Sequence, residues 1–387
     1  MKFLLIGDIG IIFTYEYITE IASKFSDCEI DILSFSPRKQ EVAAREEKLL
    51  ALGCKIYYQP QYKLCRKHKI FFPLIRLGEL YRYRMCKNYD IINIHFPGVD
   101  SVAACRWAGS KTRIITSIYG SDVLRASTRG LRIIKEVMRR SDVITVASTY
   151  IKDQISRKFD KEFDNKTAIA RYGSIAAAQM SKTIASTTKA ECKKQFHFPE
   201  QSITVLCGYN GSRAQRHIEI LKELQRLPET IQKKIFLVLQ CSYGLDKEYY
   251  KELSDALQTS QLEGVIVTDF MQGETLARFR NSIDIFLNLQ PTDVLSATMI
   301  EELEANAIVV KGDWLRYPDL EKRNIYMRSI SDMENLSQEL ACIVEHFDSE
   351  QEKTGANKGV WEILSWESQY ETWKQIICDI KVAIAAP

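Results

Sequence analysis

The sequence predicts an α/β protein with two successive domains, each built on a parallel sheet. Short apolar runs alternate with amphipathic stretches along most of the 387 residues, a pattern typical of β-α-β units. A stretch dominated by Ser, Thr, Ala and Lys, residues 176–200, shows no strong strand and is predicted to be a linker between two series of strands. The sequence contains no run of about 18 apolar residues, so no membrane-spanning helix is predicted.

The first series lies in residues 1–175, the predicted N-terminal domain. Its strands are expected at Lys2–Ile6, Glu29–Ser34, Lys55–Tyr58, Ile91–His95, Arg113–Ser117, Val143–Ala147 and Thr167–Ala170. Tyr15–Phe25 and Gln40–Leu52 are predicted helices, because their apolar residues recur at three- and four-residue spacing.

The second series lies in residues 201–360, the predicted C-terminal domain. Its strands are expected at Ile203–Cys207, Ile235–Gln240, Gly264–Thr268, Ile283–Leu289 and Ile308–Lys311. Its helices are expected at Arg216–Leu227, Lys247–Gln258, Glu274–Asn281 and Thr298–Asn306. Residues 361–387, rich in tryptophan, are predicted to form one or two further helices. Ligands of open parallel sheets bind beyond the carboxyl ends of the strands, so the loops that follow the strands should carry the chemistry.

Composition restricts the function classes. With 45% hydrophobic and 27% charged residues, the chain is neither disordered nor fibrous. The ten cysteines include no C-x-x-C pair, which favours reduced thiols in a cytoplasmic protein over a zinc site. The opening apolar run ends at Asp8 without a cleavage site, so we interpret it as a buried strand rather than a signal peptide.

Charge is unevenly distributed along the chain. Residues 1–200 contain 34 basic and 21 acidic residues, whereas residues 201–387 contain 19 and 29. Much of the basic excess falls in Tyr62–Lys87, where aromatic residues are interleaved, and in Arg125–Arg140. This mixture suits an anionic membrane surface or a phosphorylated partner, and a solvated helix face is the simpler alternative. No nucleic-acid-binding module accompanies the charge, so nucleic acid is not an expected partner.

The most informative segment is Pro291–Val310, in which a polar loop follows a predicted strand and leads into a helix. Ser296 or Thr298 is the expected N-cap, and the free N–H groups of the helix start favour an anion such as a diphosphate. Asp293 in the loop and Glu301 on the first turns can point toward one site. A carboxylate there can accept two hydrogen bonds from the vicinal hydroxyls of a ribose or a sugar. The structural alternative is an ordinary amphipathic helix with solvated acids.

A second segment, Val205–His217, also runs from a strand into a helix. Its glycines let the backbone approach a ligand closely, and Arg213 and Arg216 are able to clamp a diphosphate. His217 either touches the ligand or is only an N-terminal helix residue.

Three further loops follow strands, at Val267–Gly273, Thr116–Val123 and Gly7–Gly10. Asp122 in the second loop can hold hydroxyl groups or simply cap a helix. The third loop is not G-x-G-x-x-G, which argues against a nicotinamide cofactor.

The order of these motifs, over nearly the whole chain, resembles that of the retaining GT-B-fold glycosyltransferases of the family-four-like group (glycosyl transferases group 1). The resemblance implies two Rossmann-like domains facing each other across a cleft, with the C-terminal helices crossing back to the first domain. In that family two carboxylates with seven residues between them precede a valine-rich strand, and the second stands eight residues before the valine pair, so Val309-Val310 selects Glu301 over its neighbours Glu302 and Glu304.

The chain departs from the family pattern at four places. Asp293 stands where glutamate is usual, Tyr209 where arginine is usual, Tyr119 where histidine is usual, and Asn306-Ala307-Ile308 where Gly-x-Pro is usual. The phosphate-binding role of the missing arginine and lysine should therefore pass to Arg213 and Arg216.

The resemblance implies roles for individual residues. The residues expected to take part in catalysis are Asp122, Arg216, Asp293 and Glu301. Those expected to bind the donor are Gly208, Asn210, Gly211, Arg213, His217, Phe270, Met271, Ser296, Ala297 and Thr298, with Phe270 and Met271 at the base. Those expected to bind the acceptor are Gly10, Tyr119 and Arg125. The sequence has no D-x-D motif, so neither a metal nor a further cofactor is expected.

The implied activity is transfer of a hexosyl group from a nucleotide-diphosphate sugar, expected to be UDP-linked, to a lipid-linked or oligosaccharide acceptor. This would serve bacterial cell-surface polysaccharide assembly, in a cytoplasmic protein with peripheral contact to the inner face of the cell membrane. Two alternatives remain open: a nucleotide-sugar 2-epimerase of the same fold, and a non-catalytic two-lobed ligand-binding protein.

Overall fold

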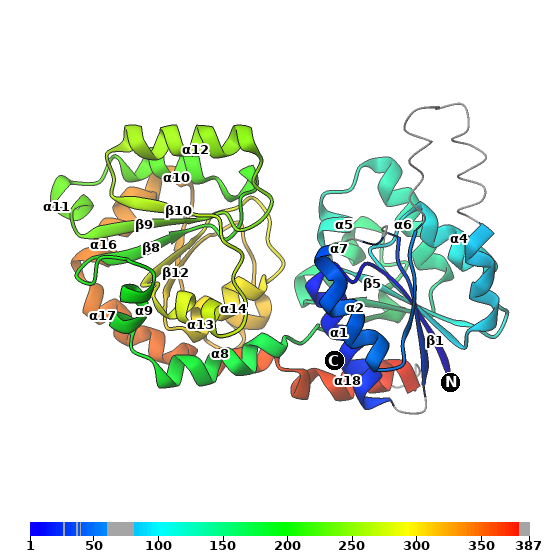
Figure 1. The fold of residues 1–387 in the computed structure, drawn as a ribbon. Coiled ribbons are helices and arrows are strands. Elements are labelled where there is room, and N and C mark those ends of the chain that lie inside the picture. Colours follow the sequence, from blue (N-terminus) through cyan, green and yellow to red (C-terminus); the bar gives the residue numbers. More distant parts are fainter. Residues whose placement is uncertain (26–27, 36–37, 39, 60–80, 379–387) are drawn as a thin grey trace. The chain divides into compact units, whose positions relative to one another are not determined.

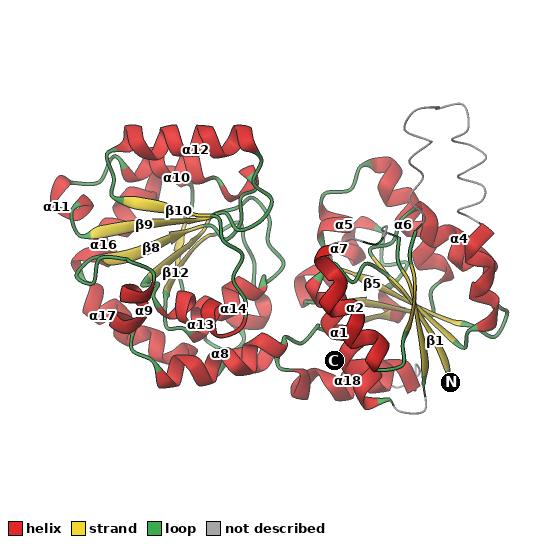
Figure 2. Ribbon diagram, viewed as in Figure 1, coloured by secondary structure: helices red, strands yellow, loops and turns green. Residues whose placement is uncertain are grey.

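The computed structural model describes residues 1–25, 28–35, 38, 40–59 and 81–378. The chain forms two compact units, one from Met1–Ser174 with Trp366–Pro387 and the other from Ile175–Ser365. Each unit has helices on both faces of a parallel sheet (Figures 1 and 2). The prediction of two Rossmann-like α/β domains is confirmed.

The sheet of the first unit has seven parallel strands in the order β3-β2-β1-β4-β5-β6-β7. Their bounds are β1 (Lys2–Ile6), β2 (Glu29–Leu33), β3 (Lys55–Tyr57), β4 (Ile91–His95), β5 (Arg113–Ile118), β6 (Val143–Val146) and β7 (Thr167–Ile169). Both faces are buried, because Phe3 and Leu5 of β1 enter one core while Leu4 and Ile6 enter the other.

Helices cover both faces of this sheet. They are α1 (Ile12–Lys24), α2 (Ala43–Ala51), α4 (Val99–Trp107), α5 (Ser121–Leu124), α6 (Thr128–Arg140), α7 (Thr149–Lys158) and α18 (Trp366–Cys378), with short 3-10 turns η1 (Gln40–Val42), η4 (Arg82–Asn88) and η5 (Asp164–Lys166). The C-terminal α18 is anchored by Trp373, which is fully buried beside Tyr17 and donates its indole N–H to Arg171 O over 2.7 Å. In Figure 1 the red α18 accordingly lies with the blue elements.

The sheet of the second unit has six parallel strands in the order β10-β9-β8-β11-β12-β13. Their bounds are β8 (Ile203–Cys207), β9 (Ile235–Gln240), β10 (Gly264–Val267), β11 (Ile285–Asn288), β12 (Ile308–Gly312) and β13 (Arg328–Ile330). The helices are α8 (Ile175–Ser186), α9 (Lys189–Gln195), α10 (His217–Leu224), α11 (Glu229–Gln232), α12 (Lys247–Ser260), α13 (Gly273–Asn281), α14 (Ala297–Glu304), α15 (Pro318–Glu321), α16 (Leu336–Glu345) and α17 (Phe347–Lys353). Short 3-10 turns are η6 (Arg213–Gln215), η7 (Met333–Asn335), η8 (Thr354–Asn357) and η9 (Val360–Leu364).

The expected linker, residues 176–200, is instead largely helical and forms part of the second unit. Thr188 and Glu191 make a capping box that starts α9, and Cys192 is fully buried. Lys193 reaches Asp284 over 2.6 Å. The Ala-, Ser- and Thr-rich composition hid these helices, because their contacts with the core lack a clear apolar period.

The C-terminal boundary also differs from the expected one at 360/361. The η9 turn packs in the core of the second unit through Val360 and Ile363. The chain returns to the first unit only at Trp366, whose ring lies where a side chain on Gly173 would stand.

In each sheet the strand order reverses at one place, between β1 and β4 in the first unit and between β8 and β11 in the second. Open α/β sheets bind ligands at such switch points, beyond the carboxyl ends of the strands. The motif-bearing loops after β8 and β11 therefore flank the switch point of the second unit. None of the helices in the described part of the chain combines the length and apolar character needed to cross a bilayer.

Candidate active site

Asp293 organises the loop that follows β11. It is 8% exposed, and its Oδ2 accepts hydrogen bonds from the Tyr317 hydroxyl at 2.7 Å and from Asn288 Nδ2 at 3.1 Å. Its Oδ1 accepts the backbone N–H of Val294 at 2.9 Å. Burial, followed by the nearby Asp293 carboxylate, raises the pKa of Tyr317 well above its usual range, so this phenol remains a donor. Most of the hydrogen bonds that the Asp293 carboxylate can accept are thus made within the protein.

The loop leads directly into α14. Ser296 is the N-cap, and its Oγ accepts the N–H of Met299 at 3.3 Å. Ala297 and Thr298 are the first two helical residues, and N–H groups at these positions have no partner within a helix. This helix start is suited to an anion.

The loop after β8 is closely packed. Gly208 has φ +66°, and Gly211 donates its N–H to Tyr243 O over 2.7 Å. A side chain on Gly211 would stand 2.4 Å from Leu245 Cβ, so only glycine lets the β9–α12 loop lie this close. Asn210 is buried and accepts the N–H of Ser212 at 2.9 Å.

The two arginines of this loop differ in their surroundings. Both Nη atoms of Arg213 donate to Glu252 over 2.6 Å, and its guanidinium lies over the Tyr249 ring. The expected role of Arg213 in clamping a diphosphate is therefore not supported, because α12 already holds this side chain. Arg216 has a left-handed backbone at the start of α10, lies over Trp314, and forms no ion pair with any described residue.

His217 is fully buried, and its Nδ1 faces the Tyr249 hydroxyl at 3.2 Å. Its Nε2 approaches Gly208, and burial lowers the pKa of His217 to about 4. Direct contact with a ligand, which we expected as one possibility, is not what this position provides. The imidazole instead packs against the turn at Gly208.

Gln290 joins the two motif loops across the switch point. Its Nε2 donates to the Tyr209 hydroxyl at 3.1 Å, and its Oε1 accepts from Gln215 Nε2 at 3.3 Å. Its backbone carbonyl accepts the indole N–H of Trp314 at 2.8 Å. The loops after β8 and β11 are therefore one connected polar structure.

The three glutamates of α14 lie in different surroundings. Glu301 accepts from Arg280 Nε at 3.0 Å through Oε2, while Glu302 is fully buried. Glu304 accepts the backbone N–H groups of Gly359 and Trp361 at 3.0 and 3.3 Å. Glu302 is therefore inaccessible, and Glu304 is engaged by backbone N–H groups. Glu301 is the remaining carboxylate of α14 that is suited to bind a ligand.

The two residues after β10 that are expected to meet the base differ in their exposure. Phe270 is 64% exposed, whereas Met271 is half-buried against the core of the second unit. Tyr243 in the neighbouring loop was not predicted. The residue is 53% exposed, and its hydroxyl is hydrogen-bonded to the side chain of Asn210.

The residues of the first unit that are expected to bind the acceptor lie after the carboxyl ends of β1 and β5. Asp122, the second residue of α5, accepts the N–H groups of Tyr119 and Gly120 at 3.1 and 2.7 Å, so its carboxylate holds the turn that precedes this helix. Gly10 donates its N–H to Asp8 at 2.8 Å, and Arg125 is exposed directly after α5.

Several site residues gave no signal in the sequence. Arg280 lies within a helix, and Tyr317 and Trp314 lie beyond the motif. Asn288 and Gln290, two polar residues at the end of an otherwise apolar strand, could have indicated the site.

The basic segments are only partly described. Most of Tyr62–Lys87 lies outside the described residues. On α6, Lys135 and Arg139 pair with Glu162 at 2.8 and 2.6 Å. Arg129 and Arg132 are exposed and form no ion pair with a described residue.

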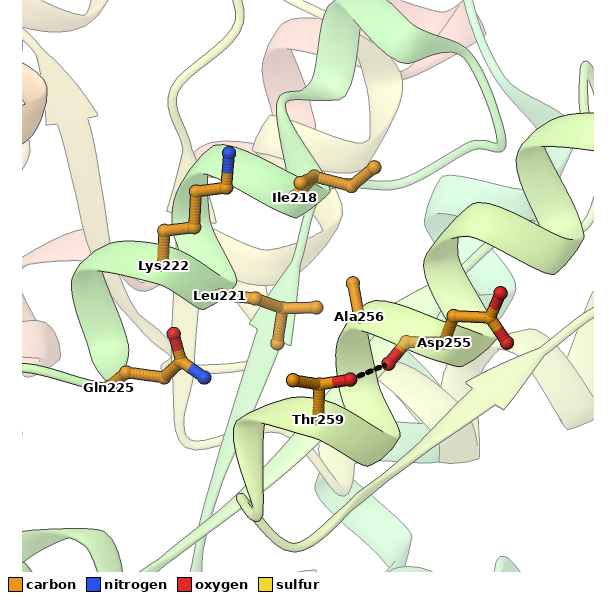
Figure 3. A pocket seen from close by; sticks show the side chains of 7 residues that line it. All are labelled: Ile218, Leu221, Lys222, Gln225, Asp255, Ala256 and Thr259. Carbon is orange, nitrogen blue, oxygen red and sulfur yellow. Dashed lines mark hydrogen bonds between the residues drawn. The ribbon is translucent and has the colours of Figure 1, made fainter.

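A groove of about 240 Å³ lies between α10 and α12, and Ile218, the residue after His217, is among its lining residues. Figure 3 shows its lining, which includes Leu221, Gln225 and Thr259 from the C-terminal halves of the two helices. Those halves lie toward the amino ends of the strands, so the groove is not part of the candidate active site.

Residues 16–169 match the family model described as Glycosyltransferase Family 4. No curated protein matches this chain. A glycosyltransferase from Rickettsia africae ESF-5 shares the fold with a TM-score of 0.72 and 12% identity, covering 98% of this chain and 98% of that chain. Anabaena Alr3699/HepE in complex with UDP and glucose has a TM-score of 0.71 and 12% identity, covering 97% and 99%. UDP-GlcNAc 2-epimerase from Neisseria meningitidis bound to UDP-GlcNAc has a TM-score of 0.59 and 14% identity, covering 97% and 100%.

The fold comparisons span nearly the whole of each chain, while the family match lies in the first unit. The comparisons therefore show the GT-B fold over nearly the whole chain and a match to Glycosyltransferase Family 4 within residues 16–169.

Proposed function

We propose that the chain is a retaining, metal-independent hexosyltransferase that uses a UDP-linked sugar bound by the second unit. The observation that carries this proposal is the bridge made by Gln290. This residue ties the glycine loop after β8 to the Asp293 loop after β11 at the switch point of the sheet. A diphosphate lying there would meet both loops at once.

In the proposed complex the diphosphate lies at the start of α14, against the N–H groups of Ala297 and Thr298, with Arg216 as the cationic partner. Glu301 accepts hydrogen bonds from the ribose hydroxyls. Asp293 keeps the loop in shape and offers Oδ1, which has one N–H donor within the protein, to the transferred sugar. Phe270 and Met271 are the proposed contacts of the base.

The reaction breaks the bond between the anomeric carbon and the diphosphate oxygen, and the acceptor hydroxyl forms the new bond from the same face. Positive charge develops on the sugar and negative charge on the leaving diphosphate. Arg216 and the N–H groups of α14 stabilise the leaving charge, and one well-placed donor of this kind is typically worth about 3–4 kcal/mol. The leaving phosphate takes the proton of the acceptor hydroxyl, and no protein nucleophile is required.

The proposed acceptor is a lipid-linked or oligosaccharide hydroxyl compound of bacterial cell-surface polysaccharide assembly, bound near Gly10, Tyr119, Asp122 and Arg125. Arg129 and Arg132 on α6, exposed and unpaired among the described residues, support contact with the anionic inner face of the membrane. Flotation with phosphatidylcholine vesicles, with and without anionic lipid, tests this. Binding that needs anionic lipid and falls in the R129E/R132E double variant is expected, and no binding at low salt would reject membrane contact.

The decisive experiment is product analysis with a UDP-sugar alone and with an added acceptor. A transferase forms a glycoside with retained anomeric configuration only when acceptor is present. An epimerase converts the donor without acceptor, and a binding protein yields no product. Beforehand, UDP at about 100 times its dissociation constant should stabilise the protein by roughly 2.7 kcal/mol in thermal unfolding.

A further inference from the structure

Arg280 on α13 forms the most heavily bonded buried cation at the candidate active site. Its guanidinium is 3% exposed and donates to four side chains on two other elements. The acceptors are Glu301 Oε2 at 3.0 Å, Glu302 Oε1 at 3.1 Å, Gln240 Oε1 at 2.8 Å and Thr298 Oγ1 at 3.2 Å. The forked guanidinium of Arg280 thus connects the end of β9 with the first turns of α14.

The two carboxylates on Arg280 are not equivalent. Glu302 is fully buried, its Oε2 has no hydrogen-bond partner among the described residues, and burial raises the pKa of Glu302 to about 8, against the opposing effect of Arg280. Besides Arg280, the charged groups that act on it are Glu301, which raises the pKa further, and Lys189, which lowers it. Burial therefore favours the protonated form of Glu302.

Glu301 keeps one oxygen available. Its Oε2 is held by Arg280 Nε, whereas no hydrogen bond from a described residue engages Oε1. The side chain of Glu301 is 10% exposed, and Oε1 is its oxygen without a hydrogen bond from a described residue.

We propose that Arg280 is a positioning residue of the donor site, which fixes the Glu301 carboxylate so that its free oxygen accepts from the vicinal diol of the nucleotide ribose. This inference rests on the proposed function, since it assumes a nucleotide at this site. Arg280 does not touch the ligand. It acts by holding Glu301 in one orientation, because a carboxylate bonded through Nε of a buried, fully engaged fork cannot rotate freely.

Lysine cannot replace this fork. A single ammonium keeps the charge but cannot span four acceptors on separate elements. Glu301 would then be free to turn away from the diol. A glutamine at 302, by contrast, has the shape and charge of the protonated acid and should leave the positioning intact.

The test is calorimetric titration of the full chain with UDP and with 2′,3′-dideoxyuridine diphosphate, which lacks the diol. For the wild type, loss of the diol should weaken binding about tenfold. For R280K, UDP should bind about tenfold more weakly, whereas the dideoxy analogue should bind nearly as it does to the wild type. R278K is the matched control, because Arg278 pairs with Glu274 on the solvent side of α13. The ratio of its affinity for UDP to its affinity for the dideoxy analogue should equal that of the wild type.

An unchanged UDP-to-dideoxy ratio in R280K would overturn the proposal while leaving the donor site in place. Absence of UDP binding by the wild type would instead reject the proposed function itself. If R280K does not fold, the comparison of the wild type with E302Q replaces it. Between pH 7 and 9 the UDP affinity of the wild type should fall relative to that of E302Q. The reason is that Glu302 ionises in this range and competes with Glu301 for Arg280. If the UDP affinity of the wild type and that of E302Q change with pH in the same way, the inference is contradicted. Any effect of the titration of UDP itself is the same for both proteins and cancels in this comparison.

Discussion

The phenol of Tyr119 donates a hydrogen bond to Nδ1 of His95 over 2.9 Å, and this direction can be deduced. Asn93 Nδ2 lies 3.3 Å from the carbonyl of Ile115, which only accepts, so the amide oxygen of Asn93 faces His95. His95 Nε2 must then carry the proton, and Nδ1 is an acceptor. Burial lowers the pKa of His95 to about 3, in keeping with a neutral ring. Tyr119, which stands where the family of the resemblance usually has a histidine, is thus held by another histidine, His95.

The variant Y119F should destabilise the first unit. It removes the donor to a fully buried imidazole nitrogen, which retains only the longer contact of 3.3 Å to Thr14 Oγ1. We expect a loss of about 1–2 kcal/mol in the free energy of unfolding, measured with urea at pH 7. Y57F, at a ring that is 40% exposed, is the control and should leave stability unchanged. Equal stability of Y119F and wild type would contradict the deduced direction of this bond.

The second unit should lose stability in mild acid because of His217. Burial lowers the pKa of His217 to about 4, while the unfolded chain binds the proton near its ordinary value of 6.5. Between these values the unfolded state holds more protons, so stability falls as the pH falls, by up to about 1.4 kcal/mol per pH unit. Urea unfolding at pH 6.5, 5.5 and 5.0 should show a shallower decline for H217Q than for the wild type. Identical slopes would mean that His217 is charged in the folded protein.

The strand series could be predicted because both faces of each sheet are buried. β1, β4, β8 and β9 begin and end where expected, since their apolar runs are bounded by polar residues. The edge strand β13, three residues long, gave too short a run to detect. The prediction of a linker at residues 176–200 was wrong. Its Ser-, Thr- and Ala-rich composition suggests a linker, whereas Thr188 and Glu191 have the spacing of a helix capping box.

The site could be predicted only as far as its local motifs reach. Ser296 is the N-cap as anticipated, since a polar residue before a helical run has few other uses. The choice between Arg213 and Arg216 depended on Glu252, which is distant in sequence. Arg280 and Tyr317 reach the site by tertiary packing alone, so no spacing rule could have revealed them.

Gly211 should not tolerate a methyl group. The Cβ of G211A would stand 2.4 Å from Leu245 Cβ and 2.7 Å from Leu245 Cα, so the β9–α12 loop must move. Overpacking of this kind typically costs about 1–3 kcal/mol. The movement should also displace Tyr243, whose carbonyl accepts the N–H of Gly211, and weaken UDP binding in calorimetry. G355A is the control, because no atom lies within 4 Å of its added carbon. Wild-type stability and affinity in G211A would show that this loop contact is loose.

The surroundings of the two arginines predict which one holds a diphosphate. R216A removes a guanidinium that has no ion pair with a described residue, so a bound diphosphate should lose a charge-assisted hydrogen bond. Such bonds are worth about 1.5–3 kcal/mol, and UDP affinity in calorimetry should fall between roughly tenfold and a hundredfold. R213A removes a side chain that already pairs with Glu252, and its affinity for UDP should stay close to that of the wild type. The reverse order, with R213A the weaker binder, would mean that the Glu252 pair opens when the nucleotide binds. The anion site would then have to be drawn nearer to α12 than to the start of α14.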